Sequence, residues 1–267
     1  MVTLKVRDYE VGVKIGESSK FRIYLGEDPQ HQVILKVAKT FNDGDVLSEE
    51  ATHLRLIWTI IGQIADYQTE QLQENAHYDW LFAKLENSFM EPSQQDRRIN
   101  VLSAVDTKLS QLTPLPKLRH DTEIDVRTSV WLLGRFLKLY GFYEILSYAD
   151  DNPITDYLKF SPADFLIGPE HHRLILYNYS GKIRDTTANS LVKLITKFIY
   201  DWIGFDIDER SQRYRELLEN YISIGRTSFE EAHGEFYDLV QELWGIKYHP
   251  FTYRKRDTQK WQIIKEE

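Results

Sequence analysis

VKIGESSKFRIYLGEDPQHQVILKVAKT, residues 13–40, is the stretch of this sequence that decides the fold. VGVKI and FRIYL alternate apolar and polar residues as half-buried strands do, and QVILKVA is a more continuous β-branched run. The connector EDPQHQ contains Pro29 and polar residues, which is typical of a hairpin turn. GESSK, between the first two strands, reads like a loop that cradles phosphates, although two of the expected glycines are absent. The stretch therefore predicts neighbouring strands, the last of which carries a lysine.

The composition is that of a soluble globular protein. The 267 residues are 42% hydrophobic and 28% charged, enough for one large domain or two packed lobes. The formal net charge of −8 argues against nonspecific binding to nucleic acid or to an anionic membrane surface. Cysteine is absent, which excludes disulfides, thiolate nucleophiles and cysteine metal sites.

The sequence gives no targeting or membrane signal. The start MVTLKVRDYE lacks the basic-then-apolar pattern of a signal peptide. The most apolar segment, LRLIWTIIGQIA, is interrupted by Arg55 and Gln63 and is too short to span a bilayer. We therefore expect a cytoplasmic protein with no direct membrane contact and no nucleic-acid partner.

Strand and helix patterns alternate in the N-terminal part of the chain. Apolar residues recur at three- and four-residue steps from residue 45 to about residue 74, which predicts a helix. Strand patterns return in WLFAKLENSFM and RINVLSAVD, with the turn EPSQQDR between them. Together with the opening stretch, these segments predict a five-stranded sheet and one helix.

The C-terminal part is mostly helical in pattern. TPLPKLRHD is interpreted as a proline-punctuated connector, and a long helix is expected over residues 124–148. FLIGPEHHRLILYNY predicts a short β hairpin that turns at Gly168-Pro169. Helices follow from residue 186, and the last of them has a capping box at its start and Gly245 at its end.

This order of elements predicts an α+β protein with two lobes. The expected domains are an N-lobe over residues 1–105, a helical C-lobe over 106–250 and a polar tail over 251–267. In that tail, Arg254, Lys255 and Arg256 are interpreted as solvated.

The opening stretch resembles the N-lobe of a protein kinase. IGESSKFRIYLGED is similar to the glycine-rich loop and the strand that follows it. Gly16 falls on the first loop glycine, Ser18 on the second and Phe21 on the third, while Ile23 falls on the valine beneath the nucleotide base. The resemblance implies a bilobal protein-kinase-like fold, with a five-stranded antiparallel N-lobe sheet plus a helix and a mostly helical C-lobe.

Two further matches complete the N-lobe. VILK resembles the V-A-I-K motif, which places the phosphate-pairing lysine at Lys36. In SEEATHLRLI, Glu50 matches the helix glutamate that pairs with that lysine. We therefore expect Lys36 and Glu50 to form an ion pair, which serves either nucleotide binding or only the structure.

The C-lobe motifs depart from the kinase pattern. YLKFSPADFLI resembles the catalytic loop H-R-D-L-K-P-E-N-I-L, with Lys159 at the catalytic aspartate and Asp164 at the metal-binding asparagine. LILYNYSG resembles the strand and turn that carry D-F-G, with Asn178 at the metal-binding aspartate. The final ELWGIKYHPF is similar to the end of a group of degenerate bacterial kinase-like domains.

These departures point to lost catalysis. Phosphoryl transfer relies on magnesium held by the aspartate of D-F-G and the loop asparagine, so Asn178 removes an anionic ligand and leaves Asp164 as a weak metal candidate. Lys159 places a cation where the substrate hydroxyl needs an acceptor. No A-P-E follows Asn178, because the helical pattern SLVKLITKFIYDW begins almost at once. The resemblance therefore implies a pseudokinase.

Several functions remain open at this point. The leading hypothesis is a catalytically inactive module that binds a protein partner and requires no cofactor. One form of this hypothesis is that the module still binds ATP or another nucleotide without magnesium. A second is an active, non-standard phosphotransferase or nucleotidyltransferase that uses ATP and a relocated base such as Asp151 or Asp156. A third is a structural subunit whose cleft is closed. Phe21 in particular would fold into the cleft.

Other conspicuous residues have ordinary structural interpretations. Asp164 is interpreted as a helix or turn cap, and Asn178 as a residue of the turn after a strand. His171 and His172 are expected to be exposed at a hairpin tip rather than to bind a metal. Trp131 and Trp202, both in helical segments, are expected in the core.

Overall fold

The computed structural model describes residues 4–28, 31–67, 77–104, 108–147, 161–178, 188–245, 247–258 and 260–264. The chain forms two compact units. The first is Met1–Leu112 together with Ile175–Ser180, and the second is Thr113–Leu174 together with Gly181–Glu267. The first unit thus extends beyond residue 105 and also includes the segment around Asn178, which lies far along the chain.

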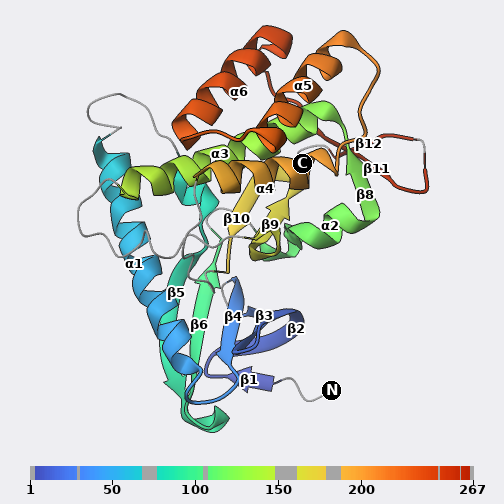
Figure 1. Ribbon diagram of the computed structural model, residues 1–267. Helices are drawn as coiled ribbons and strands as arrows, with labels where there is room; N and C mark the ends of the chain where they lie inside the picture. Colours follow the sequence, from blue (N-terminus) through green and yellow to red (C-terminus); the bar gives the residue numbers. More distant parts are fainter. Residues whose placement is uncertain are drawn as a thin grey trace. The chain divides into compact units, whose positions relative to one another are not determined.

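The first unit is built on an antiparallel sheet of strand order β1-β2-β3-β4-β6-β5 (Figure 1). The five predicted strands are present, and a short strand, β1, adds to the edge. Residues 11–38 form one continuous antiparallel arrangement in their described part, as predicted. The bounds are β1 Leu4–Val6, β2 Tyr9–Glu17, β3 Phe21–Glu27, β4 Gln32–Ala38, β5 Lys84–Glu91 and β6 Arg97–Ser103.

Strand β4 is buried on both faces of this sheet. Val33 and Leu35 face one side, where they join a cluster with Ile99 and Val101 of β6. The other face of β4 meets helix α1 (Gly44–Tyr67), whose buried residues recur at helical spacing: Leu47, Ala51, Leu54, Ile57 and Ile61. The predicted helix is confirmed in this range. A central strand covered on both sides is what allows a lysine on β4 to be completely buried.

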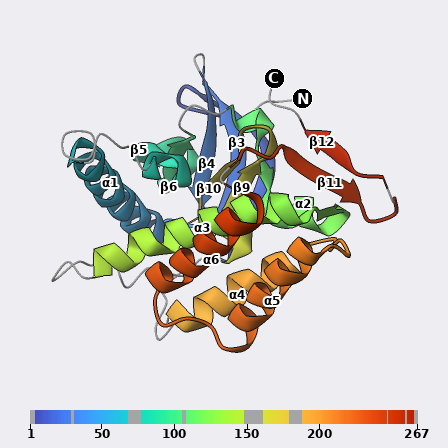
Figure 2. The ribbon, with the colours of Figure 1, turned by 90° about the horizontal axis from the view of Figure 1, so that it is seen from above.

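The second unit is mostly helical (Figures 1 and 2). Helix α3 packs against both α4 and α6, and the ring of Tyr140 on α3 stacks on Phe229 of α6 at 4.9 Å between centroids. Trp202 is fully buried, as predicted. The bounds are α2 Leu115–Asp121, α3 Val126–Ser147, α4 Ala188–Tyr200, α5 Glu209–Ser223 and α6 Phe229–Trp244.

Helix α6 begins at the predicted cap. The Ser228 hydroxyl accepts from the Glu231 backbone N–H at 3.1 Å, and the Glu144 carboxylate of α3 accepts from the N–H of Phe229 at 2.9 Å. Gly245 ends the helix with a φ of 68°, a conformation that favours glycine.

Two small sheets complete the fold. One has the order β10-β9-β7, with β7 Thr113–Pro114, β9 Phe165–Gly168 and β10 Arg173–Leu176. The predicted hairpin over this region is therefore confirmed. The other has the order β12-β11-β8, with β8 Thr122–Ile124, β11 Phe251–Lys255 and β12 Gln262–Ile264.

The second of these sheets corrects the interpretation of residues 251–267 as a polar tail. Phe251 is fully buried, and β11 pairs with both β8 and β12. Arg254 lies opposite Glu123 in the register and forms an ion pair with it at 2.6 Å, so it is not simply solvated. The charged pattern is that of a strand whose charges have partners across the sheet.

The proline-rich segment before β8 is also not a plain connector. It contains β7 and helix α2, with Pro114 at the N-cap and a second proline, Pro116, in the first turn. Proline is well tolerated there because those backbone N–H groups have no partner within the helix. Among the described helices, none is long and apolar enough to cross a bilayer.

Candidate functional site

Lys36 lies at the centre of a buried polar cluster in the first unit. Its side chain is fully buried on β4, and its ammonium pairs with the carboxylate of Glu50 on α1, which is 3% exposed. It also donates to Asn178 Oδ1 at 2.9 Å, just after β10. The predicted ion pair is confirmed, and the structure adds Asn178 as a further acceptor.

Asn100 is a member of this cluster that sequence reasoning missed. It is fully buried on β6, directly opposite Lys36 in the register, and its Nδ2 donates to Glu50 Oε2 at 2.9 Å and to Leu47 O at 2.8 Å. The first of these bonds holds Oε2 of the Glu50 carboxylate, whereas the lysine pairs with Oε1. The one available signal was an asparagine within the otherwise apolar run INVL.

Phe21 lies beside the lysine. Its ring is 1% exposed, and Lys36 Nζ lies 4.9 Å from the ring centroid, within cation–π range. Ile23, two residues further along β3, is also buried and pairs with Lys36 in the register. Phe21, which the sequence resemblance aligns with the third loop glycine, therefore points into the interior of the first unit, against Lys36.

The loop between β2 and β3 is closed by its own hydrogen bonds. The hydroxyl of Ser18 accepts from the backbone N–H groups of Lys20 at 3.2 Å and Phe21 at 3.1 Å, while the N–H of Ser18 donates to Phe21 O at 2.9 Å. Backbone N–H groups in such a loop are the donors that would cradle a phosphate. Here they are satisfied within the turn.

Gly16 is the loop glycine that the sequence retains. A Cβ at this position would lie 3.3 Å from Ile23 Cδ1 and 3.6 Å from the Tyr177 hydroxyl, so the backbone runs close to both side chains. Nothing larger than glycine fits without displacing a neighbour. Packing against these side chains therefore accounts for glycine at position 16 without any ligand.

Glu17, the next residue, forms ion pairs with lysines beside the loop. Its carboxylate lies 2.6 Å from the ammonium groups of both Lys14 and Lys39. Hydrogen bonds from these two lysines lower the pKa of Glu17 to about 2. This single carboxylate thus engages both lysines next to the loop and offsets part of their positive charge.

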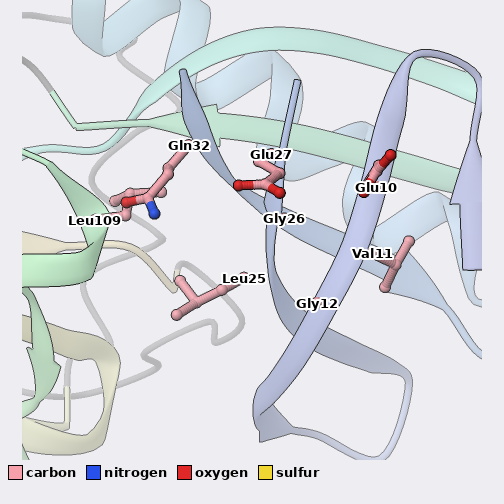
Figure 3. Close-up of a pocket in the computed structure, with 8 residues that line it drawn as sticks. All are labelled: Glu10, Val11, Gly12, Leu25, Gly26, Glu27, Gln32 and Leu109. Atoms are coloured by element: carbon pink, nitrogen blue, oxygen red, sulfur yellow. The ribbon is translucent and has the colours of Figure 1, made fainter. Parts of the chain in front are cut away.

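A small pocket of about 220 Å³ lies at the other end of β2 and β3 (Figure 3). It is lined by residues of both strands and by Leu109, and its ionisable groups are Glu10 and Glu27, which are partners in the register. Both are acidic, so this pocket does not suit a phosphate group.

In the second unit, Asp164 acts as a cap. Its Oδ2 accepts from the Ser161 backbone N–H at 2.7 Å, and the Ser161 hydroxyl accepts from Ala163 N–H at 3.2 Å, which together form a capping box. This agrees with the structural interpretation of Asp164. Lys159, Asp151 and Asp156 lie outside the described residues.

The histidines at the tip of the β9–β10 hairpin are less exposed than expected. His172 has a φ of 48° at the turn and is half-buried, because its ring packs between Trp131 and Tyr248. Trp131 itself is half-buried rather than in the core. Among the described residues, no group of three or more His, Cys, Asp or Glu side chains is arranged to hold a metal ion.

Comparison with known proteins bears directly on this geometry. No family model and no curated protein matches the sequence. The structure is similar to vaccinia related kinase 3, at 10% identity, with 90% of each chain covered and a TM-score of 0.55. It is also similar to the PknI kinase domain of Mycobacterium tuberculosis, at 10% identity over 90% of this chain and 98% of that one, with a TM-score of 0.51.

This chain has a protein-kinase-like fold. At these identities the likeness shows the fold alone, and the chemistry has to be argued from the residues. The sequence resemblance aligns Lys36, Glu50 and Asn178 with the strand lysine, the helix glutamate and the aspartate of D-F-G. The structure brings these three side chains together, with Lys36 bonded to both of the others.

The described residues do not fit a magnesium–nucleotide complex in the way a kinase holds one. Asn178, which the sequence resemblance aligns with the metal-binding aspartate of a kinase, presents an amide oxygen that accepts from Lys36. The Asp164 carboxylate accepts from the Ser161 backbone N–H, and the backbone N–H of Phe21, in the loop between β2 and β3, donates to the Ser18 hydroxyl.

Proposed function

We propose that this protein is a pseudokinase: a kinase-like domain that does not transfer phosphate and acts by binding a protein partner. The observation that carries the proposal is Asn178. The sequence resemblance aligns it with the metal-binding aspartate of a kinase, and its amide oxygen accepts a hydrogen bond from Lys36. A neutral oxygen contributes little to holding a hard divalent cation beside polyphosphate.

The loop supports the same proposal. A nucleotide phosphate would have to displace the Ser18 hydroxyl from the N–H groups of Lys20 and Phe21. It would also have to compete with Glu17 for the neighbouring lysines. Each exchange replaces an existing charge-assisted or backbone hydrogen bond, so the net gain from binding is small.

A second candidate function rests on the ion pair between Lys36 and Glu50. Active protein kinases require this pair to be in place, and here it is formed. An enzyme with relocated chemistry, which transfers a phosphoryl or nucleotidyl group from ATP, would use it to orient the nucleotide.

Nucleotide titration by thermal shift, with and without magnesium, separates these proposals. For a pseudokinase that retains its cleft we expect a small rise in melting temperature with ATP and no further rise with magnesium. A large, metal-dependent rise would support the active transferase. The absence of any shift would support a closed cleft, in which Phe21 and Ser18 occupy the nucleotide's contacts. Phe21→Gly is the matched variant, because it removes the ring beside Lys36.

A further inference from the structure

A second pocket, unrelated to the kinase-like cluster, lies within the second unit. Its volume is about 540 Å³, within the range of small-molecule sites. It is formed by α3 and α6, which lie side by side in Figures 1 and 2, together with the segment after Gly245 and the hairpin residue His172.

The charge of this pocket is opposite to that of the protein. None of the described residues that line it is Asp or Glu, although the chain carries a net charge of −8. Four lysine and arginine side chains line it: Arg127, Arg135, Lys138 and Lys247. A concentration of cations in an acidic protein indicates a local preference for anions.

Helix α3 supplies the cations at regular spacing. Arg127, Trp131 and Arg135 are four residues apart, so they share one face, with the two arginines about 12 Å apart along the axis. Neither arginine has a carboxylate partner among the described residues. Arg127 donates only to a backbone oxygen, Lys247 O, at 3.3 Å.

Arg135 is the most informative of these residues. It is half-buried, and among the described residues it has no ion pair or hydrogen bond. Burial lowers its pKa, and the nearby positive charge of Arg173 lowers it further. A half-buried guanidinium group with no partner among the described residues makes a place where an anion would relieve the cost of burial.

The carboxylate adjoining this pocket is already engaged. Asp125 lies 2.7 Å from His249, one of the lining residues, and accepts from the Thr128 backbone N–H at 2.7 Å. Both oxygens of Asp125 therefore have partners, and neither is in an ion pair with the arginines of α3.

Helix α6 supplies an apolar and aromatic wall. Phe236, Tyr237, Val240 and Trp244 recur at helical spacing along it. Gly134 on α3 faces this wall, and a Cβ there would come within van der Waals contact of Phe236, at 3.4 Å. The pocket thus has cations on one side and aromatic surface on the other.

We propose that this pocket binds a small organic anion: an aromatic or other apolar body that carries a phosphate or carboxylate group. The aromatic residues of α6 would contact the body, and Arg127 and Arg135 would donate to the anionic group. This inference does not depend on the proposed pseudokinase function, because it uses residues of the second unit only.

Isothermal titration of the full chain with matched naphthalene compounds tests this proposal. The probes are 1-naphthyl phosphate, 1-naphthoate and the neutral 1-naphthalenemethanol. We expect at least one of the anions to bind about fivefold or more tightly than the alcohol. Which anion binds better identifies the group that the arginines accept.

Variants then locate the site. Arg135→Met should weaken binding of the preferred anion by about fivefold or more and leave the alcohol within about twofold. Arg127→Met, at a more accessible position, should do the same if Arg135→Met fails to fold. Arg210→Met, which removes an exposed charge on α5 away from the pocket, should change nothing. Equal affinity for the alcohol and both anions, or unchanged anion binding in both pocket variants, would overturn the proposal.

Discussion

Removal of the buried ammonium of Lys36 tests how the cluster stabilises the first unit. The Lys36→Met change keeps most of the side-chain volume and leaves the Glu50 carboxylate buried, at 3% exposure, without its cation. Breaking a buried ion pair in this way costs about 3–5 kcal/mol, because the remaining charge has lost its compensation. We therefore expect a severe loss of stability from a single substitution.

The expected shift is measurable by urea unfolding. With an m-value of about 3 kcal/mol/M for a chain of this size, the midpoint should fall by about 1–1.7 M. Because the chain has two compact units, far-UV circular dichroism and tryptophan fluorescence must give the same transition before a free energy is calculated. Lys39→Met is the matched control, since Lys39 pairs with Glu17 at the surface and its loss should lower the midpoint by no more than about 0.3 M.

The double variant Lys36→Met/Glu50→Gln distinguishes a lost charge partner from lost packing. The neutral amide introduced at position 50 can still accept from Asn100, so the double variant should recover about 2–4 kcal/mol relative to Lys36→Met. The reasoning is refuted if Lys36→Met costs less than about 1 kcal/mol, or if the double variant is no more stable than the single one.

Three further predictions concern pH and the C-terminal sheet. The pKa of Glu17 is lowered to about 2 in the folded protein, so its stabilising effect is present above its ordinary value of 4.5 and is lost as the pH falls toward 2; Glu17→Gln should flatten the pH dependence of the urea midpoint in that interval, and an identical profile would contradict the assignment. Burial, and then Lys138, lower the pKa of His233 below 6.5, so the unfolded chain takes up more protons and stability is lost as the pH falls below that value; His233→Gln should reduce the loss measured between about pH 7.5 and 5.5, whereas an unchanged loss would rule out His233 as its source. Phe251→Ala should destabilise the protein by about 3–5 kcal/mol in the same assay, because Phe251 is fully buried in β11; a change of a few tenths would restore the interpretation of this segment as a tail.

The sheet and its ion pair were predictable because they depend on local pattern and on motif order. Alternation identified β2 and β3, and the order of V-I-L-K and the following helix identified Lys36 and Glu50 as partners. Asn100 was not predictable in the same way. Its role depends on the register that places it opposite Lys36, and no local pattern fixes the register of strands that are distant in sequence.

The closed loop and the C-terminal sheet could not be predicted for a similar reason. The sequence aligns Ser18 with the second glycine of a phosphate-binding loop, whereas its hydroxyl accepts from two backbone N–H groups of its own turn. Arg254 looked solvated because its partner, Glu123, is more than a hundred residues earlier in the chain. In both cases the competing partner becomes visible only when backbone positions are known.

Phosphate transfer itself is the measurement that tests the central proposal most directly. We expect no transfer when the protein is incubated with radiolabelled ATP, magnesium or manganese and generic protein substrates, because the sequence resemblance aligns Asn178 and Lys159 with two aspartates that the reaction needs. Lys159→Asp alone should not restore transfer, whereas Lys159→Asp/Asn178→Asp should recover a trace, since each change addresses a separate deficit. Robust phosphoryl or nucleotidyl transfer by the unmodified protein, abolished by Lys36→Ala, would contradict the account and show that the chemistry is carried by other residues.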